Sequence, residues 1–164
     1  MDTMESIKKR VSARDYDAKP VEKEKLEKIV DAGRLAPTAR GEEPWEFIVI
    51  TDKEKIKEIA GLTDHGKFLT GATAAIAVFC KDTKYYLEDG CAATENILIA
   101  ATSLGVASCW IAGDKKAYCL YVTEALGVPA SLKLISLIAL GYPKTAPVPR
   151  KKRSLDEVIH WEKF

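Results

Sequence analysis

An uncharged run from Asn96 to Gly113 is the feature that most constrains how this chain can fold. Its 18 residues approach the roughly 20 that a membrane-spanning helix requires. Hydroxyl and amide side chains interrupt the run, however, and Gly105 stands where a glycine typically ends a helix. We therefore expect a buried helix followed by a buried strand, and no association with a membrane.

The chain is long enough to form one domain with its own core. It has 164 residues, of which 47% are hydrophobic and 30% are charged, a composition typical of a globular domain. We therefore expect residues 1–164 to form a single domain. The 25 basic and 24 acidic side chains nearly balance, so overall charge does not favour a nucleic acid as partner.

The cysteines give no indication of a metal site. No two of them show CxxC spacing, and all lie far in sequence from His65 and His160. The first ten residues lack the apolar core of a signal peptide, which favours a cytoplasmic location with free thiols. The pattern assigns no role to the four cysteines, which are Cys80, Cys91, Cys109 and Cys119.

Hydrophobic periodicity and turn-forming residues divide the chain into short helices and strands. The helices are expected at residues 2–10, 21–35, 52–60, 87–104 and 114–126, and the strands at 45–51, 72–80, 108–111 and 132–140. Residues 61–71 are expected to form a loop. Thr51 with Glu54 resembles a capping box for the third helix, and Asp114 is suited to cap the last. Because helices and strands mix without strict alternation, the class is α+β, or α/β with a short sheet.

The last segment, residues 141–164, does not resemble part of a core. It contains Pro143, Pro147 and Pro149, followed by the basic run Arg150–Arg153. A proline-rich segment of this length cannot build a core by itself. We expect it to lie along another surface, such as that of a second subunit.

Two basic segments are candidates for binding a phosphate. If the first, Arg10–Arg14, is extended, Arg10, Ser12 and Arg14 point to one side and offer two guanidinium groups and a hydroxyl. The second is Arg150–Arg153 in the tail. A phosphate monoester carries a charge of about −1.5 to −2 and would hold both segments together. The alternative is that both are solvated, one as a helix end and the other as a charge run.

Two further segments are suited to contact a flat ring. Pro37 and Pro44 fix the ends of a segment that contains the small residues Thr38, Ala39 and Gly41, which predicts a rigid loop whose backbone is accessible to a heterocycle, or an ordinary connection. After the strand at 108–111, the backbone N–H groups of Ala112 and Gly113 are expected to be free to face a ligand. No dinucleotide fingerprint, P-loop or GxSxG motif is present, so an enzyme of this sequence would depend on a cofactor.

Taken together and in this order, four stretches resemble the nitroreductase family of FMN-dependent oxidoreductases. They are RVSAR at 10–14, APTARGEEPWEFIVIT at 36–51, DGCAATENILIAATSLGVASCWIAG at 89–113, and ALGYP with the RKKRSLDEVIH tail within 139–160. The resemblance spans nearly the whole chain. It implies an α+β fold with a central, mostly antiparallel sheet flanked by helices. It also implies an intertwined homodimer in which the C-terminal tail wraps the partner.

The resemblance further implies roles for particular residues. Some would hold the FMN phosphate, Arg14 would face the pyrimidine edge of the flavin, and the loop from Pro37 would reach the ring from the other subunit. The backbone of Ala112 or Gly113 would lie near flavin N5, and His65 and Lys67 would stand for a polar segment found in larger members. The full set of implied cofactor contacts is Arg10, Val11, Ser12, Arg14, Pro37, Thr38, Ala39, Arg40, His65, Lys67, Ile111, Ala112, Gly113, Lys151 and Arg153. Within this set, the phosphate contacts are Arg10, Ser12, Lys151 and Arg153.

The activity that the resemblance implies is a ping-pong reaction with NAD(P)H as the reductant. A hydride passes to flavin N5 and then to a small-molecule acceptor such as a nitroaromatic, a quinone or another flavin, without a general acid from the protein. Two positions depart from the family pattern: Gly41 stands where Asn is usual, and Glu43 where Gln is usual. The sequence identifies neither the acceptor nor the preferred nicotinamide.

Three alternatives are open on the sequence alone. One keeps the fold and changes the reaction, for example to a reductive dehalogenation. Another is a flavin-binding protein for storage or sensing that catalyses nothing. The third has no flavin and uses the basic tail to bind an acidic partner.

Overall fold

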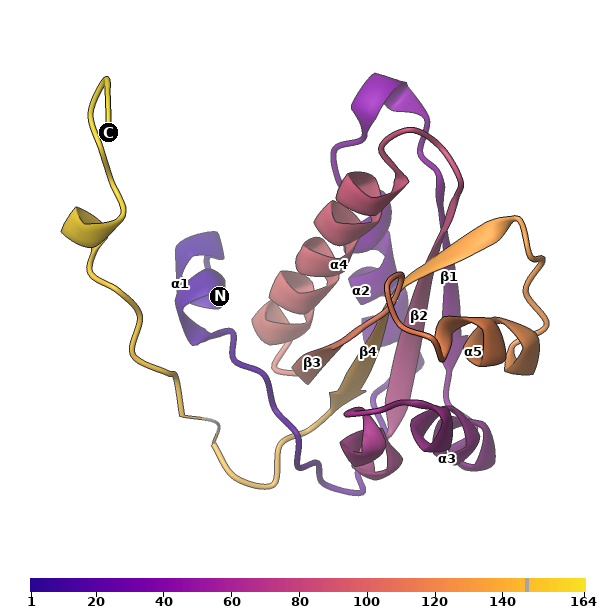
Figure 1. The fold of residues 1–164 in the computed structure, drawn as a ribbon. Coiled ribbons are helices and arrows are strands. Elements are labelled where there is room, and N and C mark those ends of the chain that lie inside the picture. The colour runs from indigo at the N-terminus through magenta and orange to yellow at the C-terminus, as the bar shows by residue number, and fades with distance from the viewer. Residues whose placement is uncertain (147) are drawn as a thin grey trace.

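The computed structural model describes residues 1–146 and 148–164; Pro147, one of the tail prolines noted above, lies outside them. Four strands form one antiparallel sheet in the order β1-β2-β4-β3 (Figure 1). The elements, with η for a 3-10 helix, are α1 (Thr3–Lys9), α2 (Lys23–Arg34), η1 (Ala39–Gly41), β1 (Trp45–Ile50), α3 (Lys53–Leu62), η2 (Lys67–Gly71), β2 (Ala74–Lys81), α4 (Tyr86–Ser103), β3 (Ala107–Ala112), α5 (Cys119–Ala125), β4 (Leu132–Gly141) and η3 (Leu155–Glu157). The predicted α+β class with an antiparallel sheet is confirmed.

Helices cover both faces of this sheet, which explains the composition of its central strands. Even-numbered residues from Ala74 to Cys80 in β2 join the core beneath α2 and α4. Odd-numbered residues from Ala75 to Phe79 join the core beneath α3 and α5. Because successive side chains of a strand point to opposite faces, β2 must be apolar from Ala74 to Cys80 to fill both cores.

The helix predicted within the uncharged run is α4, and it packs against both α2 and the sheet. Its buried stripe includes Ala93, Ile97 and Ala101. The chain then turns at Gly105, whose φ is +74°, and the Val106 N–H donates to the Ala101 carbonyl at 2.9 Å. This closure is a common way for a helix to end at a glycine, as the sequence predicted. No helix among the described residues is long and apolar enough to cross a membrane.

The predicted elements are all present, with ends within two residues of expectation except at the start of α5. That helix begins at Cys119 instead of Asp114, so the prediction that Asp114 caps it was wrong. Asp114 has a φ of +44° and donates its N–H to the Leu134 carbonyl, which continues the pairing with β4. Similarly, α3 is capped by the side chain of Asp52 rather than by Thr51, and the predicted loop at 61–71 contains the end of α3 and all of η2.

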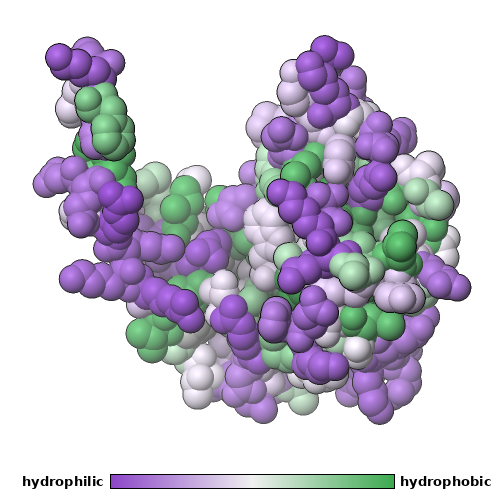
Figure 2. Space-filling model, viewed as in Figure 1, coloured by the Kyte–Doolittle hydropathy of each residue, from purple (hydrophilic) through white to green (hydrophobic). Residues whose placement is uncertain are grey.

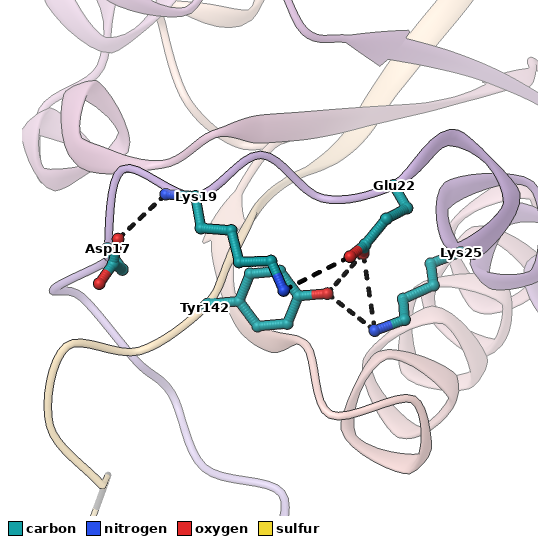
Figure 3. A network of polar contacts seen from close by, with 5 residues as sticks. All are labelled: Asp17, Lys19, Glu22, Lys25 and Tyr142. Atoms are coloured by element: carbon teal, nitrogen blue, oxygen red, sulfur yellow. Dashed lines mark hydrogen bonds and ion pairs between the residues drawn. The ribbon is translucent and has the colours of Figure 1, made fainter.

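A polar network fixes the point at which the tail leaves the sheet (Figure 3). Tyr142 donates its hydroxyl hydrogen to the Glu22 carboxylate and accepts a hydrogen bond from the Lys25 ammonium at 2.7 Å. The Lys19 ammonium lies 4.4 Å from the centre of the Tyr142 ring. The Asp17 N–H also donates to the Tyr142 carbonyl at 2.7 Å. The N-terminal segment and the start of the tail are therefore held together.

Beyond this network the tail extends away from the sheet and past α1 (Figure 1). In Figure 2 it forms an arm that projects from the body of the molecule, with hydrophobic residues among hydrophilic ones. Among the described residues of the tail, five large apolar side chains are exposed; they are Val148, Leu155, Val158, Trp161 and Phe164. The expectation that the tail is not part of its own subunit's core agrees with this arrangement.

Candidate functional site

The N-terminal segment after α1 runs along β3 and carries the first predicted basic cluster. Ser12 forms a parallel bridge with Ser108, and the Ala13 N–H donates to the Ser108 carbonyl at 3.0 Å. Beside this bridge lies a hollow of about 270 Å³, which we call the basic hollow. It is lined by Arg10, Val11, Ser12, Arg14, Val148, Arg150 and Lys152. The structure therefore brings together the two basic segments that lie about 140 positions apart in the sequence.

The charge of the basic hollow suits an anion. Four of its lining side chains are cationic, and none of the described residues that line it is acidic. Arg10 of this hollow forms a long ion pair, with 3.8 Å between Arg10 Nε and Glu95 Oε1. Guanidinium groups and a hydroxyl at one place form the donor set that proteins use for phosphate.

The tail residues at the basic hollow are not the two that the resemblance implied. Arg150 and Lys152 line it, whereas Lys151 and Arg153 do not. Alternate residues of an extended segment point to opposite sides, so either pair, but not both, faces one spot. Arg153 donates to the Glu157 carbonyl within the tail.

A second hollow, of about 180 Å³, adjoins the first, and Arg14 lines both. We call it the edge hollow because the edge strand β3 forms one side through Trp110, Ile111 and Ala112. Opposite them lie His65 and Phe68, with the Arg14 guanidinium 5.5 Å from the centre of the Phe68 ring. This cation–π contact holds the Arg14 guanidinium beside the edge hollow, which Phe68 also lines.

The backbone of β3 presents polar groups to the edge hollow. Because the Ser108 carbonyl accepts from Ala13, the polar groups of Ser108 point away from β4. Alternation along an edge strand gives Ala112 the same outward direction. The Ala112 carbonyl accepts a hydrogen bond from the Tyr118 hydroxyl. By the same alternation the Ala112 N–H points away from β4, and Ala112 lines the hollow, whereas Gly113 is buried against β4.

Two buried groups near the hollows remain protonated at neutral pH. Burial raises the pKa of Tyr118 to about 12, so its hydroxyl stays a donor to Ala112. Burial also raises the pKa of the Cys109 thiol, although Arg14 and Arg10 act in the opposite direction. Neither group is therefore poised as an anionic nucleophile. Within the described residues there is no cluster of three or more His, Cys, Asp or Glu side chains that would hold a metal ion.

Most of the remaining sequence-predicted residues line neither hollow. The loop from Pro37 to Arg40 sits beside the first turn of α4, where Asp89 holds it, and lines neither hollow. His65 lines the edge hollow, but the exposed Lys67 does not. Sequence reasoning named Arg150 and Lys152 only as part of the basic run, and it missed other lining residues, namely Asp64, Phe68, Trp110, Lys116 and Val148. Only Trp110 carried a usable signal, because it alternates with the predicted Ala112 along one strand.

Comparison with known proteins agrees with this geometry. A protein-family model described as "Putative TM nitroreductase" matches residues 2–164. This chain belongs to the nitroreductase family. The family predicted from the four sequence stretches is thereby confirmed.

Nitroreductase relatives match the chain over most of its length. A protein of Archaeoglobus fulgidus named "Putative NADH dehydrogenase/NAD(P)H nitroreductase" is 38% identical over 149 residues, covering 86% of this chain and 85% of the relative. A crystal structure with the same description from Bacteroides thetaiotaomicron has a TM-score of 0.94 at 33% identity, covering 99% and 98% of the two chains. A structure described as a putative nitroreductase in complex with FMN, from Desulfovibrio desulfuricans, has a TM-score of 0.87 at 28% identity, covering 100% and 98%.

The residues of this nitroreductase fit the cofactor that the family implies. FMN has a phosphate at one end and a flat heterocycle at the other. The basic hollow offers cations and a hydroxyl, and the adjoining edge hollow offers a cation and an outward backbone N–H. The two hollows share Arg14, so one extended molecule would span both.

Proposed function

We propose that this chain is an FMN-dependent NAD(P)H oxidoreductase that reduces small oxidised molecules such as nitroaromatics, quinones or flavins. Membership of the nitroreductase family supports the reaction class. The observation that carries the proposal is the pair of adjoining hollows joined at Arg14, one cationic and one bounded by the free edge of β3.

The basic hollow would hold the phosphate of FMN. Arg10 and Ser12 would supply donors from the N-terminal segment, and the tail would supply two further cations. Arg150 and Lys152 are favoured because they line the hollow. A shift of the extended tail by one residue would bring Lys151 and Arg153 to the hollow in their place. A hydrogen bond between charged partners contributes about 1.5–3 kcal/mol, so the loss of one should be measurable.

The edge hollow would hold the isoalloxazine ring. Arg14 would place a positive charge at the pyrimidine edge, and the Ala112 N–H would donate to a ring nitrogen. The Tyr118 hydroxyl holds the following peptide through the Ala112 carbonyl. When bound, FMN supplies the hydride chemistry, accepting from NAD(P)H and delivering to an acceptor. The protein's part is to bind the ring, orient it and leave one face open.

We also propose that the working form is a homodimer in which the tail wraps the partner. The arm of one chain exposes Leu155, Val158 and Trp161, so these side chains are not buried against their own subunit. A groove of about 950 Å³ between α2 and β1, lined by Leu26, Val30 and Phe47 among others, offers an apolar surface. Such exposed apolar surfaces favour a protein partner. A second copy of this chain has both an arm and a groove, so each arm would bind the groove of the other copy.

The dimer would also complete the flavin site. The loop from Pro37 to Arg40 lines neither hollow of its own chain. In a symmetric dimer the same loop is available to the partner's site. This supports the implication that Pro37, Thr38 and Ala39 meet the flavin of the other subunit.

The deciding experiment is the visible absorption spectrum of the purified protein with added FMN, followed by anaerobic NADH or NADPH. We expect bound flavin whose absorption bands bleach on addition of one or both nicotinamides. Bound flavin that neither nicotinamide reduces would favour storage or sensing instead. A protein that binds no FMN after the addition would contradict the proposal and leave the acidic-partner alternative.

A further inference from the structure

The carboxylate of Asp89 is buried, and both of its oxygens bind the same distant loop. Asp89 lies in the first turn of α4 and is only 4% exposed. Its Oδ2 accepts from the Thr38 hydroxyl at 2.9 Å, and its Oδ1 accepts from the Ala39 N–H at 2.9 Å. A buried carboxylate is unfavourable unless its oxygens are hydrogen-bonded, so these two contacts are what make the position tolerable.

The loop that Asp89 binds has an unusual backbone. Arg40 has a φ of 61° and Glu43 a φ of 44°, both in the left-handed region that residues with a Cβ seldom adopt. Each such residue costs about 1–3 kcal/mol and persists only where surrounding contacts hold it. The Thr38 hydroxyl oxygen accepts from the Glu43 N–H at 3.2 Å, so Asp89, through Thr38, ties the start of the loop to its end.

The approach of α4 to the sheet brings Asp89 to this position. The next residue, Gly90, has no side chain, and a Cβ there would stand 2.6 Å from Ile135 Cγ1. The first turn of α4 can therefore pack closely against β4, which buries the neighbouring Asp89. A carboxylate in the first turn is also favoured by the helix dipole.

We propose that Asp89 is a positioning residue that holds the Thr38–Arg40 loop in the conformation in which it meets the flavin ring. Asp89 acts only through the loop and does not itself contact the cofactor. The expected effect on flavin binding rests on the proposed function. The effect of Asp89 on the loop can be measured in the absence of flavin. It gives a physical reason for a charged residue at a buried position of α4.

The test uses two variants that break the contact from opposite sides and one matched control. Asp89→Ala removes both acceptors, and Thr38→Val removes the hydroxyl while keeping the shape. Glu88→Ala removes the exposed neighbouring carboxylate from the same helical turn and is the control. If one of the first two variants fails to fold, the other decides.

The first measurement is amide hydrogen exchange over residues 36–45 in the flavin-free protein. The Ala39 and Glu43 amides are both hydrogen-bonded in this arrangement. Loss of a charged hydrogen bond should speed their exchange by about tenfold or more in Asp89→Ala, and Thr38→Val should act in the same direction. Glu88→Ala should match the parent. Unchanged exchange in both test variants would overturn the proposal.

The second measurement compares FMN with riboflavin, which lacks the phosphate, by flavin fluorescence titration. Because the loop is proposed to meet the ring, Asp89→Ala should weaken both ligands by the same factor, about tenfold. Faster exchange with unaltered affinity for both ligands would overturn the positioning role. If the parent bound no flavin, the proposed function would fail, and the exchange experiment would still test whether Asp89 holds the loop.

Discussion

Gly113 lies directly against the backbone of Ile135, and a Cβ on residue 113 would stand 2.6 Å from the Ile135 carbonyl carbon and oxygen. The contact occurs at a bulge in β4, where Val78 pairs with Ser136 and Phe79 pairs with Leu134, which leaves Ile135 as the extra residue. Only a residue without a side chain permits two backbones to approach so closely. The glycine therefore fixes the end of β3 beside the edge hollow.

Replacing Gly113 with alanine should separate β3 from β4 at the edge hollow. The neighbouring atoms are backbone atoms, which cannot rotate away as a side chain would. Forcing an extra methyl group into a packed site typically destabilises a protein by about 1–3 kcal/mol. We expect a loss of that size in the free energy of unfolding in urea, and weaker FMN binding by fluorescence titration.

Gly61→Ala is the matched control for this prediction. Gly61 lies in α3 with nothing within 4 Å of its would-be Cβ, so alanine there should stabilise by about 0.5–1 kcal/mol. The two substitutions add the same methyl group and should change stability with opposite signs. A Gly113→Ala protein as stable as the parent would contradict the close approach.

The sequence was most informative where local pattern and burial agree. The apolar run in β2 predicted a strand because both of its faces are covered, and the glycines after α4 and α5 marked their ends. The RVSAR segment and the basic tail were predicted to meet at a phosphate, and the fold does bring them to one hollow. These features depend on neighbours in the chain or on charge alone.

The features that sequence reasoning missed depend on distant partners. Aspartate is a residue type that commonly caps helices, but the Asp114 N–H bonds to β4 instead. As a result α5 begins only at Cys119. Asp89 binds residues about fifty positions away, and nothing in its own helix indicates this. The choice between Arg150 with Lys152 and Lys151 with Arg153 depends on a one-residue register that no local pattern sets.

Arg10→Ala and Arg14→Ala should weaken flavin binding in distinguishable ways. Each should reduce FMN affinity by about 1.5–3 kcal/mol, the contribution of a charged hydrogen bond. Because Arg10 is proposed to bind the phosphate, its loss should leave riboflavin binding unchanged, whereas the loss of Arg14 should weaken both ligands. The control is Lys28→Ala, an exposed cation on α2. Unchanged FMN affinity in both arginine variants would remove the argument for a phosphate site.

Acid should weaken the network at the base of the tail. The hydrogen bond from Tyr142 is the main cause that lowers the pKa of Glu22 to about 2 from its ordinary value of 4.5. A group whose pKa is depressed on folding stabilises the fold above its unfolded value and loses that contribution as the pH falls, here between about 4.5 and 2. Tyr142→Phe should therefore be less stable than the parent at pH 7, with the difference shrinking toward pH 2 in urea unfolding. A difference that stayed constant with pH would contradict this role for Glu22.

Removing the tail in two steps should separate its two proposed tasks. A chain ending at Arg153 keeps the basic run but lacks the apolar residues Leu155, Val158 and Trp161, and should become monomeric by light scattering at micromolar concentration. It should also lose flavin, because a monomer lacks the partner's Pro37–Arg40 loop.

Changing Arg150–Arg153 to alanines in the full chain should instead leave a dimer that binds FMN weakly and riboflavin normally. A chain ending before Arg150 that remained dimeric and yellow would refute both tasks, since neither the apolar arm nor the basic run would then be needed.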